Sequence, residues 1–335
     1  MAAPPKPSDK SAPATPDPAD IRPDDWVDGI LPAKARPYAR LMRLDRPIGT
    51  WLLLFPGWWG TALASLAPDR WMLAMMALFG VGAIVMRGAG CTWNDITDRE
   101  FDGKVARTRT RPIPSGQVKV WQAFVFLGVL LCVGLAILLA LAWIGGQPFN
   151  WFTVWLGAAS LVLICIYPLM KRVTYWPQIF LGLAFNYGAL LGWAAQNASL
   201  DLTRWPGGWP SALLYLAGIF WTLGYDTIYA HQDKEDDALV GIKSTALKLG
   251  TRTRPFLFGF YGVACALIFW SGHLMGLSAV FWAFLGLGAL QLAWQAARID
   301  LDDPADCLRM FKSNRVFGWL VLAGLVGDAL LAGVM

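Results

Sequence analysis

The chain has 335 residues, of which 56% are hydrophobic and only 15% are charged, and its formal net charge is +5. Soluble domains usually carry about a quarter charged residues, and a mean hydropathy of +0.46 is likewise high for one. The composition excludes an ordinary soluble enzyme and predicts an all-α, polytopic membrane protein.

Residues 1–37 differ from the rest because Pro, Ala, Asp and Ser dominate them. This composition predicts a disordered cytoplasmic tail. The tail has no apolar core of a signal peptide, and its aspartates are atypical of a mitochondrial transit peptide. We therefore expect a protein of the bacterial inner (plasma) membrane, with residues 38–335 as its transmembrane domain.

The remaining sequence contains apolar runs that approach or exceed the ~20 residues needed to cross a bilayer. They predict a bundle of nine transmembrane helices, at residues 48–67, 71–93, 119–143, 150–170, 176–197, 210–230, 255–275, 278–297 and 316–334.

Lys and Arg residues gather on one side of this predicted topology. With the N-terminus inside, 26 of the 28 basic residues lie on the inner side, and only Arg70 and Arg204 lie outside. Cytoplasmic loops are normally enriched in this way. Topology thus accounts for the positive charge, and no nucleic-acid partner is implied. The sequence also gives no sign of an obligatory protein partner.

An acidic cluster follows the second predicted span, on the inner side. Asn94, Asp98 and Asp102 are spaced to fall along one face of a helix, and Asp95 lies beside that stripe. Oxygen ligands of this kind suit Mg²⁺, which usually binds one or two carboxylates together with water and phosphate. The alternative interpretation is a solvated helix end.

A second acidic cluster follows the sixth predicted span, again on the inner side. Asp226, Asp233 and Asp237 also share one helical face if the helix continues. Asp226 lies at the edge of an apolar span, where a carboxylate is costly and marks a candidate functional site. Two clusters at equivalent positions favour a magnesium site over two unrelated helix ends.

Cations near these clusters are candidates for binding a diphosphate, although each one also fits the topology signal. Arg111 precedes Pro112-Ile-Pro-Ser-Gly116, whose prolines stiffen the loop. The aromatic and basic candidates for substrate binding are Arg99, Arg111, Tyr167, Lys171, Tyr229 and Lys243, and the candidates for catalytic or acceptor-binding roles are Arg172, Arg43 and Asp226.

These motifs resemble those of the UbiA superfamily of membrane prenyltransferases. The resemblance rests on Asn94-Asp-xx-Asp98-xxx-Asp102, on Tyr225-Asp226-xx-Tyr229-Ala-xx-Asp233-xxx-Asp237 and on Arg111-Pro-x-Pro-Ser-Gly116. Shorter runs are similar to the branch that prenylates 4-hydroxybenzoate: Leu41-Met-Arg43-Leu-Asp45-Arg-Pro47-Ile-Gly49, Tyr167-Pro-x-Met-Lys171-Arg172 and Gly241-Ile-Lys243-Ser-Thr245.

The resemblance implies a reaction and its partners. The family branch joins a polyprenyl group from polyprenyl diphosphate to the ring carbon ortho to the hydroxyl of 4-hydroxybenzoate, on the route to ubiquinone. Asn94, Asp98 and Asp102 would hold one Mg²⁺, and Asp233 and Asp237 a second. An arginine, Arg172 or Arg43, would bind the acceptor carboxylate, and Asp226 would position or accept the phenol proton.

Other functions remain open at this point. A relative with another acceptor, such as homogentisate or haem, would carry the same acidic motifs. A cation transporter would use the acids as an ion path, but transporters place such sites near the midplane of the bilayer. Here the acids lie at helix ends on one side, which favours the transferase.

Overall fold

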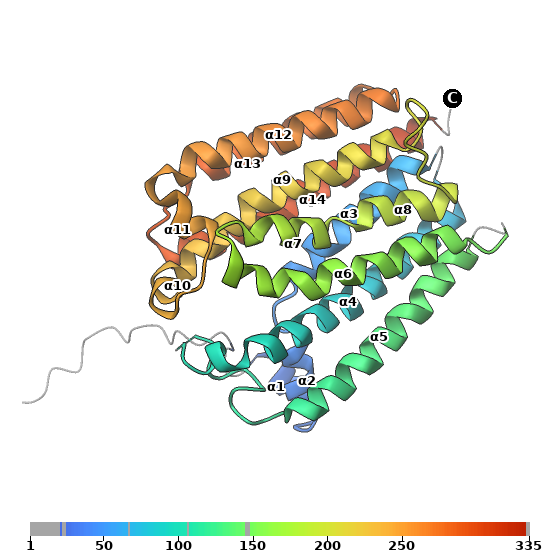
Figure 1. Cartoon of the computed structure of the whole chain (residues 1–335). Coiled ribbons are helices and arrows are strands. Elements are labelled where there is room, and N and C mark those ends of the chain that lie inside the picture. Colours follow the sequence, from blue (N-terminus) through green and yellow to red (C-terminus); the bar gives the residue numbers. More distant parts are fainter. Residues whose placement is uncertain (1–20, 22–24, 66–67, 106, 145–147, 333–335) are drawn as a thin grey trace, which may run out of the picture.

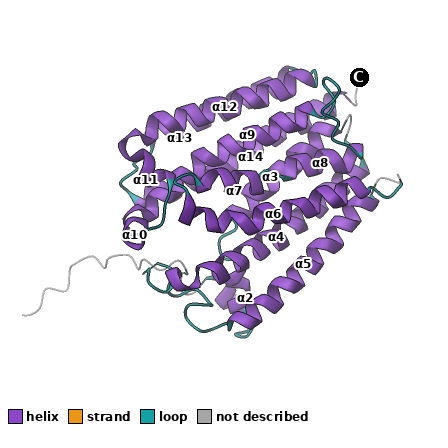
Figure 2. Ribbon diagram, in the orientation of Figure 1, coloured by secondary structure: helices purple, strands orange, loops and turns teal. Residues whose placement is uncertain are grey.

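The computed structural model describes residues 21, 25–65, 68–105, 107–144 and 148–332. Within these residues all regular secondary structure is helical (Figure 2), so the predicted all-α fold is confirmed. In chain order the helices are α1 (Trp26–Ile30), α2 (Arg36–Leu41), α3 (Ile48–Ala64), α4 (Arg70–Asp102), α5 (Val120–Trp143), α6 (Trp151–Val173), α7 (Pro177–Phe185), α8 (Gly188–Asn197), α9 (Trp209–Ala230), the 3-10 turn η1 (His231–Asp233), α10 (Lys234–Val240), α11 (Thr245–Leu249), the 3-10 turn η2 (Gly250–Arg252), α12 (Thr253–Leu274), α13 (Ala279–Arg298) and α14 (Pro304–Ala332).

Seven helical stretches in the described residues are long and apolar enough to cross a membrane, counting α7 with α8 and α11 with α12. The predicted number of nine is not confirmed, because the spans expected at residues 48–67 and 210–230 fall outside these seven. Helix α3 has only 17 residues, fewer than the ~20 of a typical span. Helix α9 is longer but carries Asp226 and several Gly, Trp and Tyr residues, which lower its hydropathy.

Part of the predicted disordered tail is helical. Residues 26–30 form α1, and α2 begins at residue 36, whereas residues 1–20 and 22–24 lie outside the described part of the chain. The Asp25 carboxylate caps α1 by accepting the backbone N–H of Val27 at 3.0 Å. Asp28 in α1 pairs with Arg40 in α2 at 2.6 Å. These local bonds explain why the end of the segment is ordered.

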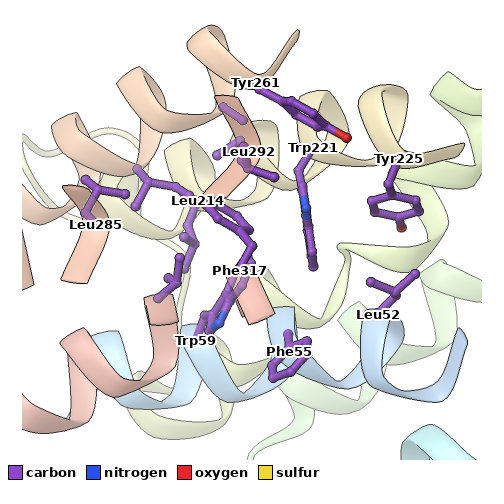
Figure 3. Close-up of a cluster of buried hydrophobic side chains, with 14 of the residues drawn as sticks. Leu52, Phe55, Trp59, Leu214, Trp221, Tyr225, Tyr261, Leu285, Leu292 and Phe317 are labelled. Atoms are coloured by element: carbon purple, nitrogen blue, oxygen red, sulfur yellow. The ribbon is translucent and has the colours of Figure 1, made fainter. Parts of the chain in front are cut away.

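The main core lies between α3, α9, α12, α13 and α14 (Figure 3). Trp59, Trp221 and Phe317 meet at its centre, with ring centroids 5.2 Å apart for the tryptophan pair and 5.3 Å apart for Trp221 and Phe317. The indole N–H of Trp221 donates to the side-chain oxygen of Asn314 at 2.9 Å. This aromatic core fixes α9, whose far end carries the second acidic motif.

The other half of the bundle contains α4, α5, α6 and the pair α7–α8 (Figure 1). Apolar side chains of α5, such as Trp121, Val125 and Val129, are exposed and form a surface suited to lipid. The short helices α10 and α11 lie at the end of the bundle where α4 and α9 both finish (Figure 1). The two acidic motifs therefore come to the same end of the molecule.

Candidate active site

A polar cavity of about 290 Å³ lies at this end of the bundle, between α4, α6, α7 and α9. Its lining brings together residues that are far apart in the sequence. The predicted site residues that line it are Arg43, Asn94, Asp102, Arg111, Tyr167, Lys171, Asp226, Tyr229, Asp233, Asp237 and Lys243.

Helix α4 stays helical through the whole first motif, so Asn94, Asp98 and Asp102 fall on one side of it. Asp98 is fully buried and holds two cations from α6: Lys171 contacts one carboxylate oxygen, and Arg172 lies 3.3 Å from the other. Tyr167, one turn earlier on α6, is 3.5 Å from the side-chain oxygen of Asn94. The carboxylate of Asp98 thereby ties α6 to α4.

Asp95 is also fully buried and interacts with arginines from two other segments. Nη2 of Arg43 lies 2.6 Å from Oδ1 of Asp95, and Nη1 of Arg111 lies 3.4 Å from the same oxygen. Arg111 also contacts Asp102, at 2.9 Å. Arg43 has a φ of 58°, which is unfavourable for a residue with a side chain. Strain of this kind is common at functional sites, and here the buried ion pair stabilises it.

The second motif differs from its predicted form. A single helix through Asp226, Asp233 and Asp237 was expected, but α9 ends at Ala230 and a 3-10 turn separates it from α10. The turn brings Asp233 against Arg107 of the α4–α5 loop, with Nη2 and Oδ2 2.7 Å apart. A continuous helix would carry Asp233 along the axis of α9, whereas the break lets the two motifs meet across the cavity.

His231 lies in the 3-10 turn, and its side chain is uncharged near neutral pH. Its Nε2 lies 3.0 Å from the hydroxyl of Thr253, and burial lowers the pKa of its imidazole to about 4. The histidine thus adds no positive charge near neutral pH. The cationic character of the site comes from arginine and lysine.

Four of the predicted site residues do not line the cavity. Asp95 and Asp98 lie behind its wall and hold the cations that face it. Arg172 packs over the ring of Phe101, 5.0 Å from its centroid. The guanidinium of Arg99 donates to the carbonyl of Ile96 and lies near Glu100, with 44% of its side chain exposed.

Several lining residues were not predicted from the sequence. Arg46, Arg87 and Arg107 add three more guanidinium groups, and Gln178 lines the cavity together with Asp226. The arginines look like topology signals in the sequence. Only the position of Arg87 inside an apolar span could have marked it, because a charge at that depth is costly.

Two of the acidic side chains that line the cavity are paired with cations. Within the part of the chain that the structure describes, no three Asp, Glu, His or Cys side chains form a group close enough to hold a metal ion. Asp102 and Asp233 face the cavity but are paired with Arg111 and Arg107. The site thus holds many oxygen donors, and positive side chains balance them.

A second cavity, of about 390 Å³, lies deeper between α3, α4, α5, α6 and α7–α8. Its lining is almost entirely apolar, mostly aliphatic, and includes Gly82, Met86 and Ile164. Met86 directly precedes Arg87 of the polar cavity, and Ile164 is about one helical turn from Tyr167. A polar and an apolar cavity therefore follow each other along the same helices.

Comparisons with known proteins bear on these features. The model of the UbiA prenyltransferase family matches residues 53–321. The chain is 48% identical over 300 residues to the "4-hydroxybenzoate polyprenyltransferase, mitochondrial" of Aedes aegypti, covering 89% of this chain but only 64%, less than two thirds, of that relative. It is 48% identical over 300 residues to the protein of the same name from Homo sapiens, covering 88% of this chain and 76% of that relative.

Solved structures resemble the fold at lower identity. A UbiA homolog from Aeropyrum pernix K1 superposes with a TM-score of 0.67 at 24% identity, over 83% of this chain and 97% of that one. A UbiA homolog from Archaeoglobus fulgidus, solved with GPP and Mg²⁺ bound, gives a TM-score of 0.57 at 15% identity, over 86% and 99%. At these identities the likeness establishes the fold alone.

The predicted location in a bacterial inner membrane is wrong. The relatives in Aedes aegypti and Homo sapiens are mitochondrial enzymes of eukaryotes, which points to a mitochondrial membrane. The distribution of Lys and Arg reports the side of a membrane on which a loop lies and does not identify the membrane. The tail residues whose composition argued against a transit peptide lie mostly outside the described part of the chain.

The family assignment rests on two agreeing findings. The family model covers most of the chain, including both acidic motifs. The human relative is 48% identical over more than two thirds of its own length. The chain belongs to the UbiA prenyltransferase family.

Proposed function

We propose that the chain transfers a polyprenyl group from polyprenyl diphosphate to the ring carbon ortho to the hydroxyl of 4-hydroxybenzoate, in ubiquinone biosynthesis. One observation carries the reaction class: acids of two motifs, from α4 and from the α9–α10 region, line one cavity together with arginines and lysines. The acceptor is supported by the names of the relatives at 48% identity.

We propose that the cavity binds a divalent cation, Mg²⁺. Asn94, Asp102, Asp233 and Asp237 present amide and carboxylate oxygens to the same space, and hard oxygen ligands are those that Mg²⁺ prefers. The Archaeoglobus fulgidus homolog was solved with Mg²⁺ bound. When bound, the metal would neutralise the diphosphate and stabilise it as a leaving group.

The cations of the cavity suit the diphosphate of the donor. Arg111, Lys171 and Lys243 line the same space as the acids, and their charges would stabilise the negative charge that grows on the leaving oxygen. The aliphatic cavity begins within about one helical turn of this site. We propose that it takes the first isoprene units of the tail, and that surrounding lipid takes the remainder.

The reaction replaces one bond at the prenyl C1 carbon and one bond at a ring carbon of the acceptor. The bond between prenyl C1 and the diphosphate oxygen breaks, and its electron pair leaves with the diphosphate. A ring carbon of the acceptor bonds to C1 and then loses its proton. We propose that Asp226, which faces the cavity from α9, positions the phenol or accepts a proton. Exclusion of water from the occupied cavity would protect the prenyl cation from hydrolysis.

A direct test uses purified protein in detergent, a long-chain polyprenyl diphosphate, radiolabelled 4-hydroxybenzoate and Mg²⁺. The wild-type chain should move label into the organic phase. Asp102→Asn and Asp233→Asn should each lower transfer by about 100-fold or more, since each removes the charge of a carboxylate that lines the cavity. The matched control is Asp201→Asn, because Asp201 is partly exposed in the α8–α9 loop and does not line the cavity.

The outcomes separate the parts of the proposal. Near-normal transfer by either acid variant removes that residue from the metal and diphosphate site. If the folded wild-type chain labels another phenol but never 4-hydroxybenzoate, the proposed acceptor is wrong and the reaction class stands.

A further inference from the structure

Helices α1 and α2 lie at the polar end of the bundle, beside the first turns of α5 (Figure 1). The ring of Tyr38 in α2 lies 5.1 Å from the ring of Phe126 in α5. Leu41, the last residue of α2, is buried in one apolar cluster with Ile96 of α4 and Ala123 of α5. Helix α2 is thus packed at the level of the first turns of α5, and α1 packs on α2.

Helix α1 has an exposed apolar face. Trp26 and Ile30 are four residues apart and lie on the same side of the helix, with 45% and 74% of their surfaces exposed. The other sides of α1 face the protein: Val27 is fully buried, and Asp28 pairs with Arg40 of α2 at 2.6 Å. Tryptophan and aliphatic side chains in this arrangement are typical of helices that lie in a membrane interface.

A similar surface is present on α5 at the same level. Trp121, Phe124 and Val125, in the first two turns of α5, are exposed apolar residues of the surface that suits lipid. Because α2 packs on this part of α5, the apolar face of α1 continues the lipid-facing surface of the bundle. The neighbouring surface therefore indicates a bilayer as the partner of α1.

Exposed lysines accompany these apolar side chains. Lys34 lies in the connection between α1 and α2, and Lys119 directly precedes α5. The acidic groups of this segment are engaged within the protein, since Asp25 and Asp28 both pair with Arg40, at 3.9 and 2.6 Å. The charge exposed beside the apolar face is therefore positive, which suits the phosphates of anionic lipid.

A short series of contacts connects α1 to the polar cavity. Arg40 pairs with Asp28 of α1, and its backbone carbonyl accepts a hydrogen bond from Nη1 of Arg43 at 3.0 Å. Nη2 of Arg43 lies 2.6 Å from Asp95 in α4. Arg43 lines the cavity with a positive φ, so its position depends on how firmly α2 is held.

We propose that α1 docks on the surface of a bilayer that contains anionic lipid. The side chains of Trp26 and Ile30 insert among the upper acyl chains, and Lys34 lies at the headgroup phosphates. This anchor holds α2, and with it Arg43, against α4. The docking does not depend on the reaction proposed above, so it is tested without substrate.

The test measures the depth of residue 30 in the full chain, reconstituted in nanodiscs of phosphatidylcholine and phosphatidylglycerol. Ile30→Cys carries an NBD fluorophore, and the exposed native cysteines, Cys132 and Cys165, are replaced by Ala in this labelling background. A nitroxide on the upper acyl chain should quench the label about threefold or more strongly than the same label at Lys104→Cys. Lys104 is exposed just after α4, and aqueous iodide should quench there more strongly than at position 30.

A second arm of the test changes the charge. Lys34→Glu should lower the quenching of the Ile30→Cys label by the lipid nitroxide about twofold or more in the anionic nanodiscs. In nanodiscs of phosphatidylcholine alone the same substitution should have little effect. Arg252→Glu is the matched control, because Arg252 is also exposed but lies before α12, and it should leave the quenching unchanged.

Amide hydrogen exchange tests whether the anchor holds α2. Replacing both apolar residues, Trp26→Ser with Ile30→Ser, should speed exchange in residues 36–42 by about tenfold. Exchange in α12 should stay the same, and Trp26→Phe with Ile30→Leu should restore slow exchange in residues 36–42.

Three results would overturn the proposal. Equal quenching by iodide at positions 30 and 104 would place the apolar face of α1 in water. A label at position 30 that neither quencher reaches would mean that protein covers this face, either another segment of the chain or a second copy. Unchanged exchange in the double serine variant would show that α2 is held without the anchor.

Discussion

Buried carboxylates at the polar cavity depend on cations supplied by other segments. Asp95 contacts Arg43 from the end of α2 and Arg111 from the α4–α5 loop, and Asp98 contacts Lys171 from α6. Removing one partner of a buried pair commonly costs about 3–5 kcal/mol, because it leaves an uncompensated charge. These pairs therefore hold the segments around the cavity together, and they also balance its charge.

Arg111 offers a sharp test at this scale because one of its nitrogens, Nη1, reaches both Asp95 and Asp102. Lysine keeps the charge but cannot reproduce the planar fork. We expect Arg111→Lys to lower turnover by about 10- to 100-fold and to raise the KM of the polyprenyl diphosphate. The control is Arg109→Lys, an exposed residue of the same loop. Normal kinetics in Arg111→Lys would contradict the bridging role.

The sequence predicted the residue types of the site better than their partners. The spacing of Asn94, Asp98 and Asp102 identified one face of a helix, because that relation is local. The pairing of Asp233 with Arg107 joins segments 126 residues apart, and no local pattern encodes it. Arg87 was missed for a related reason, since a lone arginine in an apolar run shows its purpose only when the facing helices are known.

At the scale of single elements, the two acidic motifs are built differently. Helix α4 runs unbroken to Asp102, whereas the 3-10 turn at His231–Asp233 interrupts the second motif. Helical spacing alone predicted two equivalent helices. The interruption is accompanied by tertiary contacts, among them the buried hydrogen bond between His231 and Thr253. Helical spacing of residues in the sequence is thus a reliable guide to a continuous helix only where contacts with neighbouring segments do not interrupt it.

Close helix packing positions the elements around the site. A Cβ at Gly60 of α3 would lie 2.1 Å from the backbone oxygen of Ala189 in α8, and a backbone atom cannot move aside cheaply. We expect Gly60→Ala to destabilise the protein by about 1–3 kcal/mol, seen as a lower Tm in detergent. Gly262→Ala in α12, with open space at its Cβ, is the control and should be neutral or slightly stabilising. Equal Tm values for the two variants would contradict this close packing of α3 against α8.

At the scale of the whole molecule, charge and apolarity are separated along the bundle. The polar cavity lies at the end where α4 and α9 finish, and the aliphatic cavity continues deeper among α4, α5 and α6. Apolar periodicity and the Lys and Arg distribution predicted the membrane fold and its polar end. They could not predict the cavities, because a cavity depends on how side chains from several helices fit together.

Gly82 tests whether the aliphatic cavity holds the donor tail. A side chain there would enter the cavity, and its Cβ would be at ordinary contact distance, 3.5 Å, from Ile137. We expect Gly82→Leu to lower kcat/KM for a long-chain polyprenyl diphosphate by about tenfold or more, and to affect dimethylallyl diphosphate much less, because its single isoprene unit is too short to reach Gly82. Gly80→Leu, on the same helix but outside the cavity lining, is the matched control. An equal effect on both donors would place the tail elsewhere.

The central claim is divalent-cation-dependent prenylation of 4-hydroxybenzoate at the polar cavity. Its most direct measurement is product formation by the metal-stripped wild-type chain, with radiolabelled 4-hydroxybenzoate and a long-chain polyprenyl diphosphate, before and after Mg²⁺ is restored. We expect no labelled lipid in EDTA and full transfer after Mg²⁺ is added in excess. Equal transfer with and without the metal, by protein shown to be free of bound cations, would contradict the claim.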